Sequence, residues 1–84
     1  MPARGAYRLI VTRTGHAPAR LAAPDRIDTF EIVSIDDMEV VLFWDIPARA
    51  TSRLEATIRA DLETLDAEEF YARWAAFDVA DLGA

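Results

Sequence analysis

Residues 28–46, DTFEIVSIDDMEVVLFWDI, are mostly apolar, with acidic residues at the centre and near both ends. Two runs rich in Val, Ile, Phe and Trp flank the Asp36-Asp37 pair, and this pattern predicts a β-hairpin that turns at those two aspartates. Asp-Asp suits a two-residue hairpin turn less well than Asp-Gly does, so a longer loop is an alternative.

A two-residue turn also predicts which side chains share a face of the hairpin, because successive residues of a strand point to opposite sides. Face A then carries Thr29, Glu31, Val33, Ile35, Met38, Val40, Leu42 and Trp44. Face B has an apolar centre made of Phe30, Ile32, Val41 and Phe43, with Asp28, Ser34, Glu39 and Asp45 at its two ends. A register shift of one residue would exchange the faces of one strand.

A further strand is predicted ahead of the hairpin. Tyr7 to Arg13 alternates Tyr, Leu and Val with Arg, Ile and Thr. Residues 1–6 are expected to be a frayed terminus. Residues 14–26, TGHAPARLAAPDR, contain Gly and two Pro and follow no period, so they predict a long loop.

Helical periodicity replaces alternation after Pro47. Apolar residues recur at helical spacing up to about residue 65, and they are Leu54, Ile58, Leu62 and Leu65. Asp66 is a suitable N-cap for a second helix to about Ala80, with an apolar stripe of Phe70, Trp74 and Phe77. Neither Gly nor Pro separates the two segments, so one bent helix is an alternative.

The order of elements is therefore βββαα, and the sequence predicts a single α+β domain over residues 1–84. We expect a three-stranded antiparallel sheet with both helices packed on face A.

Charge is distributed unevenly along the chain, whose net charge is −6. Residues 1–26 hold five arginines against one aspartate, a net charge of +4, whereas residues 27–84 hold four arginines against fourteen acids, a net charge of −10. The acidic body makes nucleic-acid binding an unfavoured function. Every basic residue is Arg and Ala is abundant, which suggests a GC-rich, bacterial genome.

The absence of certain residues and motifs from the sequence argues against several classes of function. Without cysteine there is no disulfide, thiolate nucleophile or Cys-based metal site. The sequence contains neither a signal-peptide core nor an apolar run long enough for a membrane span, so we expect a cytoplasmic protein. No Gly-rich phosphate loop or other cofactor motif is found, and we predict no cofactor.

Three small groups of residues could carry chemistry. His16 is the only histidine, and its position in the long loop favours an exposed surface residue over a general base. Asp36, Asp37 and Glu39 could hold a divalent cation weakly, but a solvated turn is favoured. Asp28 and Asp45 face each other in the predicted pairing and could form an acid–base pair, although solvated strand ends are favoured because paired carboxylates need a cleft.

Basic residues gather around the long loop. Arg13, His16, Arg20 and Arg26 could hold an anion or an acidic partner. The alternative is that these arginines pair with acids of the same chain.

The apolar centre of face B is the strongest functional signal. Phe30, Ile32, Val41 and Phe43 within a polar rim resemble the layout of a protein interface, and we expect them to bind a second copy of the chain as a homodimer. The sequence thus favours a small non-enzymatic interaction module. Two alternatives are a ligand-binding or minor catalytic domain with a pocket between sheet and helices, and a nucleic-acid-associated regulator that uses the arginines of the first third.

Overall fold

The computed structural model describes residues 1–13 and 26–82. A short 3-10 turn, η1 (Ala3–Gly5), leads into the strands β1 (Tyr7–Thr12), β2 (Ile27–Ser34) and β3 (Val40–Pro47). The helices α1 (Ala48–Thr64) and α2 (Ala67–Ala75) and a last 3-10 turn, η3 (Val79–Leu82), follow. The strands form an antiparallel sheet in the order β1-β2-β3, so the predicted α+β fold with the order βββαα is confirmed.

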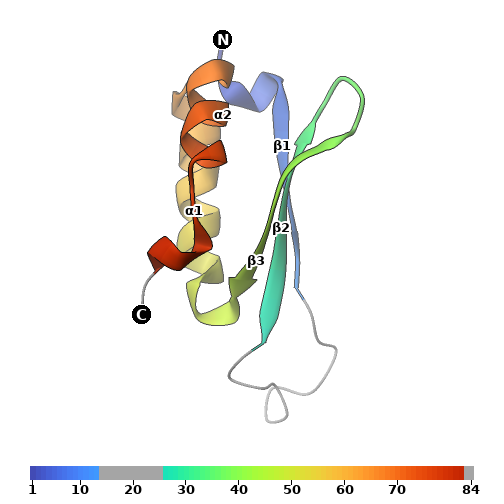
Figure 1. Ribbon diagram of the computed structural model, residues 1–84. Coiled ribbons are helices and arrows are strands. Elements are labelled where there is room, and N and C mark those ends of the chain that lie inside the picture. Colours follow the sequence, from blue (N-terminus) through green and yellow to red (C-terminus); the bar gives the residue numbers. More distant parts are fainter. Residues whose placement is uncertain (14–25, 83–84) are drawn as a thin grey trace.

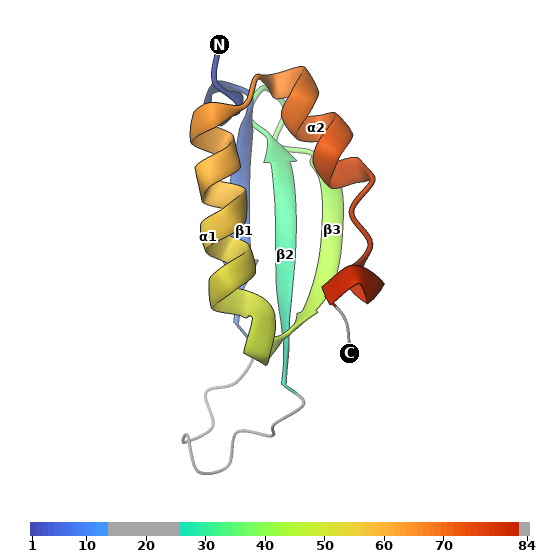
Figure 2. The ribbon, with the colours of Figure 1, turned by 90° about the vertical axis from the view of Figure 1, so that its left-hand side faces the viewer.

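The sheet and the helices form two layers (Figure 1). Figure 2 looks through the helical layer onto the sheet, with α1 over β1 and with α2 and η3 on the β3 side. Between the layers lies one buried cluster to which the strands and both helices contribute, and its largest members are Leu9, Phe30, Ile32, Trp44, Ile46, Leu54, Ile58, Leu62, Phe70 and Trp74. The apolar stripes that predicted the two helices therefore supply the helical half of the core.

The register of the β2–β3 hairpin changes along its length. Next to the turn Val33 pairs with Val40, as the two-residue count predicts, but Ile32 pairs with Leu42 and Phe30 with Trp44. Val41 is thus an extra residue, a β-bulge, on β3. With one extra residue on β3, the residues of β2 and β3 that were predicted to share a face point to opposite sides from Ile32 and Leu42 to the open end of the hairpin. The predicted division into face A and face B is therefore wrong in that part.

The hairpin loop is longer than two residues. The Met38 N–H donates to the Ser34 carbonyl at 2.8 Å, and the Ser34 N–H donates to the Glu39 carbonyl at 2.8 Å. Residues 35–38 therefore form the loop, and Met38 closes it with a φ of 58°. A left-handed residue at the end of such a loop lets the chain re-enter the sheet with the right twist, a position that Gly or Asn takes more readily than Met.

Two helices, and not one bent helix, follow the sheet. Leu65 is extended, with φ −96° and ψ 152°, so α1 ends there and α2 begins after Asp66. The Ala3 N–H donates to the Leu65 carbonyl at 2.8 Å, and the Ala3 side chain is completely buried. Residues 1–6, which we expected to be frayed, instead pack against the junction of the two helices.

Candidate functional site

The face of the sheet opposite the helices is not covered by any element in the described part of the chain (Figure 1). The alternation of the strands and their pairing assign to this open face the residues Arg8, Ile10, Thr12, Ile27, Thr29, Glu31, Val33, Val40, Phe43 and Asp45. Four of its apolar side chains are exposed, Ile10 by 36%, Ile27 by 43%, Val40 by 49% and Phe43 by 55%, whereas Val33 is buried at 3%. The open face thus offers apolar surface of the kind that marks interaction sites.

The four residues predicted to bind a partner do not form one patch. Phe30 and Ile32 have no exposed surface, because the register beyond the bulge turns them toward the helices. Val41 is half-buried and packs against the same core. Of the four, only Phe43 lies on the open face. The predicted set of partner-binding residues is therefore wrong, whereas the prediction that one apolar sheet face is left uncovered by the helices agrees with the structure.

Sequence reasoning missed the other exposed members of the open face, although a signal for them is present. Phe30 and Ile32 flank Glu31 on one strand, and Trp44 and Ile46 flank Asp45 on the other, so each pair marks an apolar side of its strand. If the pairing next to the turn follows the two-residue count, both apolar sets can face the core only when one strand has an unpaired residue, which is a bulge.

Charged residues surround the apolar part of the open face. Residues that pair across the strands form a row of the sheet. Arg8 on β1 is in the row of Val33 and Val40, and Asp45 on β3 is in the row of Thr29, so Arg8 and Asp45 lie at opposite corners of the open face. Glu31 is half-buried in the middle strand, paired with Ile10 on one side and Phe43 on the other. Among the described residues, neither Arg8 nor Asp45 forms an ion pair.

Two of the predicted basic-cluster residues converge on a buried acid. Arg26 Nε lies 3.3 Å from Asp28 Oδ1, and Arg13 Nη1 lies 3.9 Å from Asp28 Oδ2. Arg13 also contacts Glu55 Oε1 at 3.0 Å. His16 and Arg20 lie outside the described residues. The arginines at the two ends of the long loop thus contact acids of their own chain, and binding of an external anion by the four stays a prediction.

Asp28 ties the first strand of the hairpin to α1. Its carboxylate is completely buried on the helix side of the sheet, and it accepts a hydrogen bond of 2.7 Å from the Thr51 hydroxyl. The predicted pairing of Asp28 with Asp45 is wrong, because Asp28 pairs with Ile46 and Asp45 points to the open face. A carboxylate held by a hydroxyl and two guanidinium groups is suited to fixing structure.

The acidic turn makes local contacts. Asp37 Oδ1 accepts a hydrogen bond of 3.1 Å from the Glu39 N–H, as short acids in turns often do. Within residues 1–13 and 26–82, no three acidic or histidine side chains come together as metal ligands. In the same part of the chain, no helix has the length and apolarity that crossing a bilayer requires.

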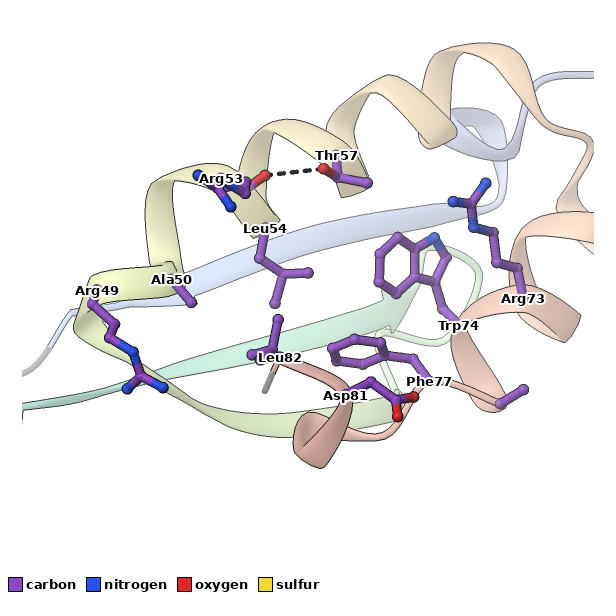
Figure 3. Close-up of a pocket in the computed structure, with 11 residues that line it drawn as sticks. Arg49, Ala50, Arg53, Leu54, Thr57, Arg73, Trp74, Phe77, Asp81 and Leu82 are labelled. Carbon is purple, nitrogen blue, oxygen red and sulfur yellow. Dashed lines mark hydrogen bonds between the residues drawn. The ribbon is translucent and has the colours of Figure 1, made fainter. Parts of the chain in front are cut away.

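A groove of about 620 Å³ lies between α1 on one side and α2 with η3 on the other (Figure 3). Its apolar lining consists of Ala50, Leu54, Trp74, Ala76, Phe77 and Leu82, and its charged lining consists of Arg49, Arg53, Arg73 and Asp81. Its rim therefore holds three arginines and one acid, although the chain as a whole is acidic. The sequence contains these arginines, but only the packing of α2 beside α1 brings them together.

The comparisons with known proteins found no relationship: no family model, curated protein or solved structure matches the chain.

Proposed function

We propose that this chain is a small non-enzymatic interaction module that self-associates through the open face of its sheet. The observation that carries the proposal is the exposure of Ile10, Ile27, Val40 and Phe43 on one sheet face that no described element covers. Removing such surface from water is the main driving force of association, and a second copy brings an equal apolar area.

The charges of the open face suit an association between identical copies. Consider a two-fold axis that lies between two facing sheets, perpendicular to the line from Arg8 to Asp45. This axis brings Arg8 of one copy over Asp45 of the other, and the reverse pair forms at the opposite corner. Opposite charges at a rim orient the two copies, although exposed pairs add little affinity.

The size of the face limits the expected affinity. Strands of six to eight residues, spaced ~4.8 Å apart, give a three-stranded face of roughly 14 by 22 Å. A dimer built on this face belongs to the low end of interface sizes, and we expect a Kd of about 1–100 μM. A cytoplasmic location, expected from the sequence, stays a prediction.

Phe43→Glu tests the proposal. Phe43 is 55% exposed, so the change leaves the monomer folded, while it brings a carboxylate into the contact and should split the dimer. Tyr71→Glu is the matched control, because Tyr71 is a 40% exposed aromatic residue on the helical layer. Size exclusion with light scattering at ~1 mM, about tenfold above the weakest expected Kd, measures the mass.

We expect dimers for the wild type and for Tyr71→Glu and monomers for Phe43→Glu, all with the same circular dichroism spectrum. A monomeric wild type, or a Phe43→Glu variant that stays dimeric, would contradict the proposal.

A further inference from the structure

The groove between α1 and α2 concentrates positive charge in the acidic part of the chain. Residues 27–84 carry a net charge of −10 and hold only four arginines. Three of the four, Arg49, Arg53 and Arg73, line this one groove, and among the described residues Asp81 is the one acid in the lining, while Asp61 pairs with Arg73 just outside it. The lining of this groove is therefore locally basic within an acidic part of the chain, which favours the approach of a negatively charged molecule.

The three arginines are held in different ways. Arg73 lies on α2 with its Nη1 3.3 Å from Asp61 Oδ2, and its guanidinium carbon is 5.7 Å from the centre of the Trp74 ring. Arg49 also takes part in contacts within the chain. Arg53 follows Arg49 by four residues on α1, so the two lie on the same side of the helix. In the part of the chain that the structure describes, Arg53 forms no ion pair.

The inner wall of the groove is apolar. Figure 3 shows Leu54 from α1 and Leu82 from η3 pointing toward one another, with the rings of Trp74 and Phe77 beside them. Leu54 and Trp74 are buried in the core, which gives this wall a fixed shape. A volume of about 620 Å³ is within the range of small-molecule sites, and an apolar wall with a few polar groups at the rim is their usual construction.

We propose that this groove binds a small amphipathic oxyanion. The apolar body of the ligand lies against Leu54, Trp74 and Phe77, and its carboxylate or phosphate head pairs with Arg53, whose planar guanidinium matches either oxyanion with two hydrogen bonds. This site lies on the helical side of the sheet, opposite the open face, so its existence is independent of self-association.

A titration followed by two-dimensional ¹H–¹⁵N NMR tests the proposal, because it reports both the affinity and the position of the ligand. The probes are octanoate and octyl phosphate, and octanol is the neutral control of equal chain length. We expect both anions to bind with a Kd in the millimolar range or tighter and to shift the Trp74 indole N–H signal, with octanol about tenfold weaker or more. The tighter of the two anions identifies the preferred head group.

Variants locate the charge that matters. Arg53→Gln should weaken octanoate binding by about tenfold, because it removes a charge-assisted hydrogen bond. Arg59→Gln is the matched control on the same helix: Arg59 pairs with Glu55 at 3.0 Å, away from the groove, and its loss should leave the Kd unchanged. Phe43→Glu should also leave it unchanged, which separates the groove from the open face. Octanol that binds as tightly as octanoate, an unaltered Kd for Arg53→Gln, or no binding of either anion would overturn the proposal.

Discussion

The indole Nε1–H of Trp74 donates a hydrogen bond of 3.1 Å to Asp61 Oδ2, and this bond joins α2 to α1 inside the protein. Trp74 is 4% exposed, and its ring lies edge-on to Trp44 of the sheet with the ring centres 6.0 Å apart. One side chain thus links both helices with β3.

We expect Trp74→Ala to lower the free energy of unfolding by about 3–5 kcal/mol, the cost of removing a buried aromatic side chain. Trp74→Phe keeps much of the apolar volume but deprives Asp61 of a donor, and it should cost about 1–3 kcal/mol. Urea melts measure both values. A midpoint of Trp74→Ala equal to that of the wild type would mean that α2 is not docked on the sheet.

The hydroxyl of Thr51 should contribute to stability through Asp28. Thr51→Val has nearly the same shape but removes the 2.7 Å hydrogen bond to a completely buried carboxylate. We expect a loss of about 1–3 kcal/mol in the free energy of unfolding, because a buried charged group loses one of its donors. Thr51→Ser keeps the hydroxyl and is the control in the same thermal or urea melts; equal losses for the two variants would assign the effect to packing instead.

Glu31 should oppose the self-association that we propose. It lies on the middle strand, in the row between those of Arg8 and Asp45, so the proposed two-fold axis passes close to it. Two carboxylates would then approach each other as water leaves the interface, which is unfavourable. Glu31→Gln should tighten the dimer by about tenfold, the equivalent of ~1.4 kcal/mol.

Sedimentation equilibrium of Glu31→Gln and of Asp37→Asn, a loop control, measures this change. Weaker association of Glu31→Gln would rule out the proposed axis while leaving the choice of face to the Phe43→Glu experiment.

Duplex DNA should bind no better than non-specifically. Arg13 and Arg26, which belong to the basic first third, contact the chain's own Asp28, and the rest of the chain is strongly acidic. Fluorescence anisotropy at physiological salt should give a Kd weaker than ~10⁻⁶ M for any sequence, the usual non-specific range. A sequence-dependent Kd below ~10⁻⁷ M would revive the nucleic-acid hypothesis.

The sequence predicts the elements of this fold well, because each has a periodicity that burial imposes. Leu54, Ile58 and Leu62 mark the buried stripe of α1, and Phe70 and Trp74 mark that of α2. Pairing of Val33 with Val40 also follows from the position of the turn. These features depend on local spacing alone, which a single sequence contains.

The same reasoning could not predict which residues of β2 and β3 line the open face, because the bulge at one residue determines it. Val41 is an aliphatic residue like its neighbours Val40 and Leu42, so nothing in its chemistry distinguishes a bulged residue from a paired one. The groove depends on where α2 lies relative to α1, which the contacts of Trp74 with Asp61 and Trp44 determine. Contacts between residues far apart in the sequence leave no periodic signal.

The buried hydrogen bond from Ala3 to Leu65 has a consequence for local opening. Amide protons near the start of a chain normally exchange rapidly with solvent, because the terminus frays. The Ala3 amide is instead bonded at the junction of α1 and α2, with its side chain completely enclosed. Its exchange should therefore require the segment that contains Ala3 to detach from the junction of the two helices, so this amide reports how firmly the start of the sequence is docked there.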